Sequence, residues 1–513
     1  MEIEFWKKYF PEFREKTAAF YQGHLSVAEY KGFSGLYGSY AQRGGKASML
    51  RLRMTAGCVT KEKLAFIAKA IRDYKIDRVH FTTCETVQLH NLGERAVTEL
   101  LEKALDAGII TMGGGGDFPR NVMCSPLSGV EVGEYFDVMP WAKAAGEYLM
   151  TLIPAEKMPR KLKVCFSNSP ANVVHATYRD LGFVAREDQT FDVYSAGGLG
   201  NNAKLGILVA EQVRPQKILY YIKAMWLMFC AYGNYKNRGK ARTRYMQETF
   251  ETVEAYREAF QEKLREALDS GEDMDLEIMQ HEVQKKEDGS RVSGKWILPQ
   301  KQNGLYTVKW HPIGGQPRPE ILCELSDLIA DMENTELRLA PDETAYIINL
   351  TGAEAEKVQE VIFSDQAGTL FETSVSCIGA SICQVGLRDS QELLWKCVKA
   401  VRQAEIPDGA LPKIHISGCT SSCGTHQTGV MGFRGAVKNV DGKPQPAYIF
   451  YINGCERQGQ EQFGYEAGTM LAEVIPAFLV ELGQTVAASG MDYSNWHQMH
   501  AQELEALAGK YLG

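Results

Sequence analysis

The chain contains an internal repeat, and this repeat limits the possible folds more than any other feature of the sequence. Residues 163–183 (KVCFSNSPANVVHATYRDLGF) and residues 413–433 (KIHISGCTSSCGTHQTGVMGF) match at a constant spacing of 250 residues, which pairs Gly182 with Gly432. Both segments begin with alternating apolar residues, the pattern of a strand. The repeat predicts two similar halves that pack about a pseudo-twofold axis.

A second similarity links the segments that precede the two copies of this repeat. Residues 80–108 and residues 337–363 each predict a strand followed by an amphipathic helix. The apolar residues that share one helix face are Val97, Leu100, Leu101 and Ala104 in the first half and Val358, Val361 and Ile362 in the second. Each half is therefore predicted to hold an α+β unit followed by a strand-and-loop unit.

Residues 240–300 separate the two halves. The charged sequence KARTRYMQETFETVEAYREAFQEKLREAL (residues 240–268) predicts a helix, and the polar sequence QKKEDGSRVSGKW (residues 284–296) predicts a connector.

Composition excludes several classes of protein. The chain has 513 residues, of which 45% are hydrophobic and 23% charged, and its formal net charge is −8. A negative balance argues against nucleic-acid binding, and no apolar run reaches the roughly 20 residues of a membrane helix. The start, MEIEFWKKYFPEF, lacks the apolar core of a signal peptide. We expect a cytoplasmic protein that binds neither nucleic acid nor membrane.

Four of the 12 cysteines stand in two close pairs: Cys377 with Cys383, and Cys419 with Cys423. Structural zinc sites favour C-x2-C spacing, whereas these pairs are C-x5-C and C-x3-C. An iron–sulfur cluster also takes four thiolates and tolerates wider spacing, and unrelated core cysteines are the third interpretation. Spacing and isolation favour the iron–sulfur cluster.

The first half has no such cysteine pairs, since Ser169 and Val173 stand at the repeat positions of Cys419 and Cys423, and it carries basic residues instead. In the sequence MLRLRM, Arg51 and Arg53 share one strand face, and in PRKLKVCF, Lys161 and Lys163 share another. A solvated polar face would explain any one of these strands. Their recurrence in one half indicates a surface that binds anions.

These motifs resemble the sirohaem-dependent sulfite and nitrite reductases. The pattern C-x5-C followed by SGC-x3-CG is similar to the family's cluster motif. Further similar segments, in the family's order, are SYAQRGGKASMLRLRM, FPRNVMCSPLSG, MPRKLKV and NYKNRGKARTRY. The resemblance implies that Cys377, Cys383, Cys419 and Cys423 hold a [4Fe-4S] cluster, with Cys423 bridging to the sirohaem iron.

The resemblance also implies the fold. It is an α+β, internally duplicated sulfite/nitrite reductase fold with ferredoxin-like half-domains and two mixed sheet and helix domains. We expect a first ferredoxin-like half-domain with an N-terminal extension in residues 1–120 and a first reductase domain with the basic face in 121–300. A second half-domain is expected in 301–370, and a second reductase domain with the cysteines in 371–513.

The family's substrate pocket maps onto four basic residues of this sequence: Arg53, Arg120, Lys161 and Lys163. Their expected work is to bind an oxyanion, polarise it and deliver protons. Sirohaem carboxylates would fall to Gln42, Arg43, Lys46, Arg51, Gln88, His90, Arg160, Arg238, Lys240, Arg242 and Arg244.

The substrate prediction depends on one residue. Nitrite reductases resembling the plant enzyme usually carry asparagine where this chain has Lys163, so we expect six-electron reduction of sulfite to sulfide. No flavin or nicotinamide motif is visible, so the electrons are expected from ferredoxin or a similar carrier. The alternatives are a ferredoxin nitrite reductase that makes ammonium and a non-catalytic sirohaem or iron–sulfur sensor or carrier.

Two positions stand out beside these motifs. The segment TTCETVQLH has Cys84 and Glu85 where the family usually has an arginine, so one expected cofactor contact is lost. His426 lies close to the second cysteine pair and is either a buried loop histidine or part of the site.

Overall fold

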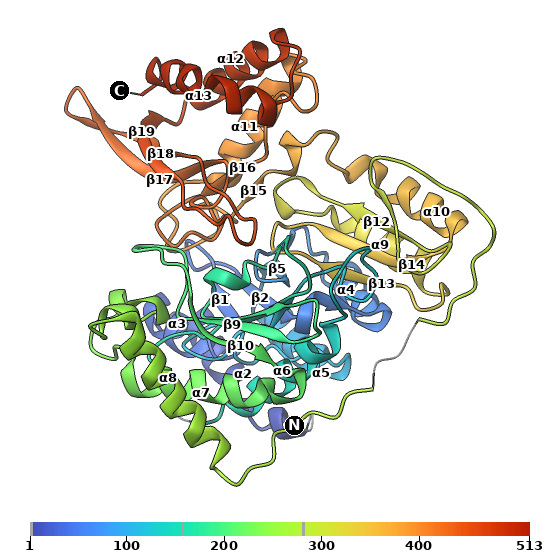
Figure 1. Cartoon of the computed structure of the whole chain (residues 1–513), viewed down its shortest axis with the longest axis vertical. Coiled ribbons are helices and arrows are strands. Elements are labelled where there is room, and N and C mark those ends of the chain that lie inside the picture. The colour runs from blue at the N-terminus through green and yellow to red at the C-terminus, as the bar shows by residue number, and fades with distance from the viewer. Residues whose placement is uncertain (1–3, 156, 172, 280–282, 513) are drawn as a thin grey trace. The chain divides into compact units, whose positions relative to one another are not determined.

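The computed structural model describes residues 4–155, 157–171, 173–279 and 283–512 (Figure 1). The chain forms two compact units, each assembled from segments distant in sequence. Unit 1 comprises Met1–Gly198, Asn202–Trp310 and Pro317–Ser364, and unit 2 comprises Leu199–Asn201, His311–Gln316 and Asp365–Gly513. The boundaries expected for four domains stay a prediction.

The first sheet of unit 1 is antiparallel, with strand order β1-β2-β5-β4. Its strands are β1 (Ser39–Ala41), β2 (Ser48–Arg53), β5 (Thr86–Leu92) and β4 (Val79–Phe81). Its helices are α1 (Glu4–Lys7), α2 (Phe10–Tyr21), α3 (Val27–Ser34), α4 (Lys61–Tyr74) and α5 (Glu94–Asp106). The apolar face predicted for α5 is buried as expected, because Val97, Leu100, Leu101 and Ala104 pack into the core.

A second sheet of unit 1 repeats this plan with residues of the second half. Its order is β11-β12-β14-β13-β3, and β3 (Cys58–Val59) is the one strand contributed by the first half. The other strands are β11 (Ile297–Pro299), β12 (Tyr306–Trp310), β14 (Ala345–Leu350) and β13 (Glu336–Leu339). Two helices, α9 (Pro319–Ile329) and α10 (Gly352–Ile362), pack on it, and both sheets share one hydrophobic core.

The third sheet of unit 1 has the order β10-β9-β8-β7-β6. Its strands are β6 (Met123–Cys124), β7 (Val164–Ser167), β8 (Leu181–Ala185), β9 (Phe191–Ser195) and β10 (Ile207–Val213). Helices α6 (Met139–Thr151), α7 (Ile218–Tyr232) and α8 (Val253–Leu268) bury their apolar residues against it.

Unit 2 contains a sheet of the same design, with the order β15-β16-β17-β18-β19. Its strands are β15 (Val375–Ser376), β16 (Ile414–Ser417), β17 (Met431–Val440), β18 (Lys443–Ile452) and β19 (Tyr465–Leu471). Helices α11 (Ser390–Gln403), α12 (Ile475–Ala488) and α13 (Tyr493–Gly509) complete its core (Figure 1).

The predicted repeat is confirmed in detail by strand register. Val164 of β7 pairs with Leu181 of β8, and Ile414 of β16 pairs with Met431 of β17, at the same spacing of 250 residues. In both copies the first three strands in chain order pair in parallel. Each of the last two strands pairs antiparallel with the strand before it. The α+β class and the duplication are therefore both confirmed.

The helix expected over residues 240–268 is shorter than predicted, because α8 begins at Val253. Thr252 has extended backbone, and its side chain accepts a hydrogen bond from the Ala255 N–H, which is how a helix N-cap works. The residues before it form two short 3-10 turns, Arg238–Lys240 and Thr243–Glu248. Over the described part of the chain, no helix combines the length and apolar character needed to span a bilayer.

Candidate active site

Arg53 lies at the end of β2 and is almost fully buried. Its guanidinium donates hydrogen bonds to the backbone carbonyls of Met112 (3.3 Å), Pro119 (2.9 Å) and Arg120 (2.9 Å). Burial, followed by the positive charge of Arg120, lowers the pKa of Arg53 to about 9. The group is still charged at neutral pH and is held in one orientation.

Arg120 is fixed by the glycine run that precedes it. Its Nη1 donates to the Gly114 carbonyl (2.9 Å) and its Nη2 to the Gly116 carbonyl (2.8 Å). Its Nε is buried and has no hydrogen-bond partner among the described residues. Burial is the main cause that lowers the pKa of Arg120 to about 10. The Gly114 carbonyl also accepts a hydrogen bond from Arg51. Residues 113–116 are therefore a loop whose backbone carbonyls bind arginine side chains.

Lys163 immediately precedes β7, and its backbone and its side chain contact different groups. Its backbone N–H donates to Asp180 Oδ2 (2.8 Å), and its Nζ lies 3.1 Å from the sulfur of Cys84. Burial alone would raise the pKa of Asp180, but Arg242, Thr243 and Lys163 together bring it below its ordinary value. The lysine therefore sits in a network of charges that reaches from β7 to residue 242.

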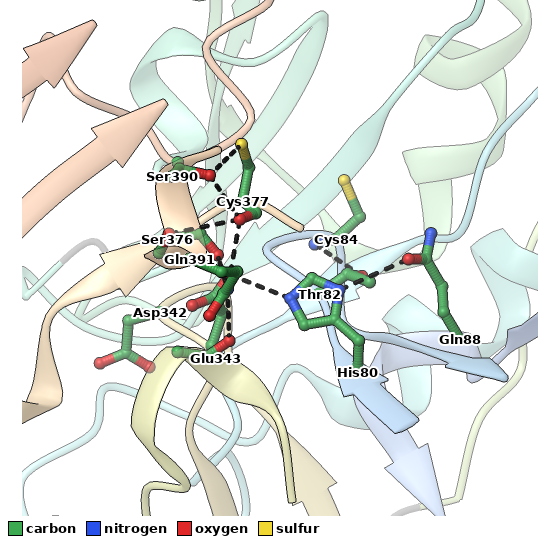
Figure 2. A network of polar contacts seen from close by, with 12 residues as sticks. His80, Thr82, Cys84, Gln88, Asp342, Glu343, Ser376, Cys377, Ser390 and Gln391 are labelled. Carbon is green, nitrogen blue, oxygen red and sulfur yellow. Dashed lines mark hydrogen bonds and ion pairs between the residues drawn. The ribbon is translucent and has the colours of Figure 1, made fainter. Parts of the chain in front are cut away.

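Four of the predicted sirohaem contacts form one polar network on the first sheet. Gln42 Oε1 accepts from the Asn91 N–H (2.8 Å) and lies 3.3 Å from His90 Nδ1. With its amide oxygen toward Arg51, Gln88 accepts from Arg51 Nε at 3.1 Å. Gln88 also contacts His80 (3.4 Å), as Figure 2 shows. Burial lowers the pKa of His90 well below its ordinary value, which keeps this ring neutral.

Three other predicted contacts are paired with acids inside unit 1. Asp117 binds Arg160 (2.6 Å) and Arg238 (2.6 Å), and the buried Asp180 binds Arg242 (2.8 Å). The remaining predicted sirohaem contacts are Arg43, Lys46 and Lys240, which are exposed, and Arg244, which is buried. Lys161, predicted for the substrate pocket, is partly buried. Lys240 and Arg242 also line a cavity of about 150 Å³ with Tyr232 and Tyr245.

Sequence reasoning missed the two acids that organise these bases. Asp117 stands inside the motif GGGGDFPR, and Asp180 directly precedes β8. Asp117 could have been predicted, because it is a single acidic residue between two basic segments. No local pattern marks Asp180, because its partners Arg242 and Thr243 lie far along the chain.

The four paired cysteines lie in unit 2 and follow two neighbouring parallel strands. Cys377 comes directly after β15, and Gly418 and Cys419 directly after β16. Because these strands run parallel, their carboxyl ends meet at one edge of the sheet. The Gly418 N–H donates to the Cys377 sulfur (3.2 Å), and Ser390 Oγ lies 3.0 Å from the same sulfur (Figure 2).

The loops that carry the cysteines pack too closely for larger residues. A Cβ added at Gly418 would lie 2.4 Å from the Arg388 carbonyl oxygen and 3.6 Å from the Cys377 sulfur. A Cβ at Gly424 would lie 2.0 Å from the Ile416 carbonyl oxygen. Burial, and then the neighbouring charge of Cys423, raises the pKa of Cys377 to about 12.

The four paired cysteines supply the number of thiols that a [4Fe-4S] cluster takes, and all four are free. Within the described ranges, no three histidine, cysteine, aspartate or glutamate side chains converge as ligands of one ion. In a [4Fe-4S] cluster each thiolate binds its own iron.

Unit 1 has the same edge without cysteines. Ser125 follows β6 as Cys377 follows β15, and its Oγ accepts a hydrogen bond from the Asn168 N–H (3.1 Å). Asn168 is the repeat partner of Gly418, whose N–H makes the equivalent bond to sulfur. At this position the second copy of the fold therefore carries a thiol where the first carries a hydroxyl.

His426 is buried and stacks beside Tyr451, with ring centroids 4.9 Å apart. Neither of its ring nitrogens has a hydrogen-bond partner among the described residues. Burial lowers its pKa to about 3, so the ring is neutral.

Comparison with known proteins identifies two domain families in this chain. Residues 40–107 match the nitrite/sulfite reductase ferredoxin-like half domain, and residues 115–268 match the nitrite and sulphite reductase 4Fe-4S domain. Together these matches confirm the expected fold class, including its ferredoxin-like half-domains.

Curated relatives and one solved structure resemble most of the chain. The assimilatory ferredoxin-dependent nitrite reductase of Haloferax mediterranei is 23% identical over 514 residues, which covers 92% of this chain and 85% of the relative. The ferredoxin–nitrite reductase of Synechococcus elongatus is 25% identical and covers 82% and 81%. The structure of the Mycobacterium tuberculosis NirA protein has a TM-score of 0.75 at 20% identity, and the match covers 91% of this chain and 89% of that one.

The names of these relatives contradict sulfite as the expected substrate. They are nitrite reductases, and a chloroplastic ferredoxin–nitrite reductase from Arabidopsis thaliana, 25% identical over 83% of this chain, is another. The prediction of sulfite was wrong because it depended on one residue of the family resemblance, whereas the named nitrite reductases resemble most of the chain. In the structure the Lys163 ammonium contacts the sulfur of Cys84.

Proposed function

Because the chain belongs to the nitrite and sulfite reductase family, we propose that it is an enzyme that reduces nitrite to ammonium with electrons from ferredoxin. The proposal is supported by the nitrite reductases that resemble most of the chain and by the buried cations of unit 1. The reaction consumes six electrons and eight protons per nitrite and releases ammonium and two waters. A cytoplasmic location remains part of the proposal.

The family's cofactors are sirohaem and a [4Fe-4S] cluster, and the chain has residues that fit both. When bound, these groups supply single electrons and an iron at which the anion is reduced. The four paired thiols, Cys377, Cys383, Cys419 and Cys423, would hold the cluster, and the Cys377 sulfur already contacts a backbone N–H and a hydroxyl. The cationic residues of unit 1 would bind sirohaem carboxylates.

The observation that carries the proposal is a pair of arginines in unit 1, of which Arg53 is buried and Arg120 is partly buried. Each guanidinium is held by backbone carbonyls, and loss of solvent around each one lowers its pKa. The two like charges repel each other, so a bound anion stabilises both. Because the arginines are already oriented, little reorganisation is needed when a small planar anion such as nitrite binds.

Protons for the reaction are assigned to Lys161 and Lys163. A lysine can give up its proton more readily than an arginine, whose charge is nearly permanent. Arg53 and Arg120 bind and orient the anion, and the lysines donate to its oxygens as these leave as water.

The first test is the ratio of kcat/KM for nitrite and sulfite, measured on the cofactor-loaded protein with reduced ferredoxin. We expect nitrite to be preferred. Arg120→Met should lower kcat/KM for nitrite by about 100-fold, in the range seen when one charged anion donor is removed. Arg95→Met is the matched control, since Arg95 is exposed on α5 and lies outside the pocket.

A preference for sulfite, or full activity of the Arg120 variant with an unchanged KM, would overturn the proposal. Iron and sirohaem content measured on each variant separates loss of cofactor from loss of anion binding.

A further inference from the structure

Cys84 occupies a rigid turn between β4 and β5. The turn is closed by the Thr82 N–H, which donates to the Thr86 carbonyl (3.0 Å), and by the hydroxyls of the same two threonines (2.7 Å). The Cys84 N–H donates to Thr82 Oγ1 (3.3 Å), and Asn121 Nδ2 donates to the Cys84 carbonyl (3.2 Å). Figure 2 shows Cys84 beside Thr82. These bonds hold the backbone of Cys84 in place.

The Cys84 sulfur lies among cations that come from other elements. Lys163 Nζ is 3.1 Å away, and Arg179 and Lys161 also act on it electrostatically. Burial alone would raise the pKa of Cys84, but Lys163, Arg179 and Lys161 lower it to about 6. At neutral pH the sulfur is mostly thiolate and forms an ion pair with Lys163.

The other titratable groups near Cys84 do not replace this negative charge. Burial raises the pKa of Glu85 well above its ordinary value, and its carboxylate accepts from the Cys124 N–H (2.9 Å). Burial raises the pKa of Cys165 to about 12, so that thiol stays neutral. Arg120 is a further cation whose charge interacts with Cys84.

We propose that Cys84 is a positioning residue that holds Lys163 and offsets its charge, so that the pocket favours singly charged nitrite over doubly charged sulfite. The inference rests on the proposed function and explains why Lys163 does not indicate a sulfite reductase. It also assigns a role to the residue that replaces the arginine expected at this position.

The physical argument compares the pocket with and without the negative charge of the Cys84 thiolate. Without the thiolate, the pocket gains a net positive charge, and its attraction for a dianion grows more than its attraction for a monoanion. Lys163 also loses the contact that fixes its ammonium, so proton delivery is less well oriented. Removal of the thiolate should therefore lower KM for sulfite and lower kcat for nitrite.

The test compares Cys84→Ser with Cys84→Asp in the cofactor-loaded protein. Serine keeps the size and removes the charge, whereas aspartate keeps the charge. We expect Cys84→Ser to raise the sulfite-to-nitrite ratio of kcat/KM on the order of tenfold, and Cys84→Asp to stay near the wild-type ratio. Cys230→Ser is the control for loss of a thiol elsewhere. Equal ratios for serine and aspartate would overturn the inference.

A second measurement does not depend on catalysis. The alkylation rate of Cys84 by iodoacetamide is followed against pH, with the Cys84 peptide resolved by mass spectrometry. We expect a midpoint near the lowered pKa in the wild type and a shift of at least one pH unit upward in Lys163→Met. A wild-type midpoint of 8 or above, or no shift in Lys163→Met, contradicts the ion pair. If Cys84 resists the reagent throughout, the substrate ratio decides alone.

The two proposals fail in different ways. A wild-type protein that does not reduce nitrite overturns the proposed function, while the alkylation profile still decides whether Cys84 and Lys163 form a pair. A nitrite reductase whose serine and aspartate variants behave alike retains its function and loses only the role of Cys84.

Discussion

At the scale of single residues, the clearest constraint is steric and occurs twice. A Cβ added at Gly182 would lie 1.8 Å from the Ala176 carbonyl oxygen, and one at Gly432 would lie 1.9 Å from the His426 carbonyl oxygen. Both glycines sit at the same place in the repeat, where a loop folds back on the strand that follows it. The close approach explains why glycine stands at this position in both copies.

We therefore predict that Gly432→Ala and Gly182→Ala each lower the free energy of unfolding by about 2 kcal/mol or more, because the backbone must move to relieve the overlap. Thermal unfolding measures the loss. Gly432→Ala should also lower the iron content, since its loop carries Cys423, whereas Gly182→Ala should not. Gly32→Ala is the control, because Gly32 lies in α3 with open space around it. Wild-type stability of both repeat variants would contradict the steric argument.

At the same scale, the sequence indicated the residue types of the site but not the pairs they form. Arg53, Lys163 and the four cysteines were predicted from alternation, from spacing and from the family resemblance, and their roles stay predictions. The contact between Lys163 and Cys84 joins two segments that are 79 residues apart in the sequence, and no local pattern encodes it. The substrate prediction depended on Lys163 alone, and the sequence did not show the side-chain contact that Lys163 makes with Cys84.

At the scale of elements, a buried ion pair joins the start of β8 to the segment before α8. Asp180 is fully buried, and Arg242 and Thr243 both bind its carboxylate. The pKa of Asp180 is lowered from its ordinary value of 3.8. Because the folded-state pKa is depressed, the pair contributes stability above about pH 4 that is lost as the pH falls through the lowered value.

Arg242→Met should thus destabilise the protein by about 3 kcal/mol at pH 7, because a buried carboxylate is left without its cation. The loss should be smaller at pH 3, where the carboxylate of the variant is protonated. The double variant Asp180→Asn with Arg242→Met should recover part of the stability. Urea unfolding at the two pH values measures these differences, and an equal loss at both would show that the charge of Asp180 is not involved.

The elements themselves were largely predictable, and the exceptions have local causes. The constant spacing of the repeat predicted equivalent strands, and the registers of β7 with β8 and β16 with β17 agree with it. The helix before residue 253 was mispredicted because charge-rich composition favours helix, while Thr252 caps the chain and Arg242 is drawn to Asp180. Tertiary contacts override propensity there.

At the scale of the whole molecule, the two copies of the reductase fold divide the chemistry. Unit 1 holds the buried arginines and the ion pair of Cys84 with Lys163, and unit 2 holds all four thiols of the cluster motif. The cluster loops of unit 2 follow two short parallel strands. We expect the folded conformation of these loops to depend on the cluster, because a cluster that binds only the folded loops stabilises them by mass action.

This division predicts where the molecule loosens when iron is removed by a chelator under reducing conditions. Hydrogen exchange followed by mass spectrometry should rise most in residues 377–390 and 417–430, the two loops that carry the cysteines. The core in which α4 packs on α9 should keep its protection, since it belongs to unit 1 and contains no ligand of the cluster. Cys397→Ser, which removes a buried thiol of α11 outside the motif, is the control for thiol loss without loss of iron. Uniform loosening of both units would mean that the cluster stabilises the whole chain rather than its own loops.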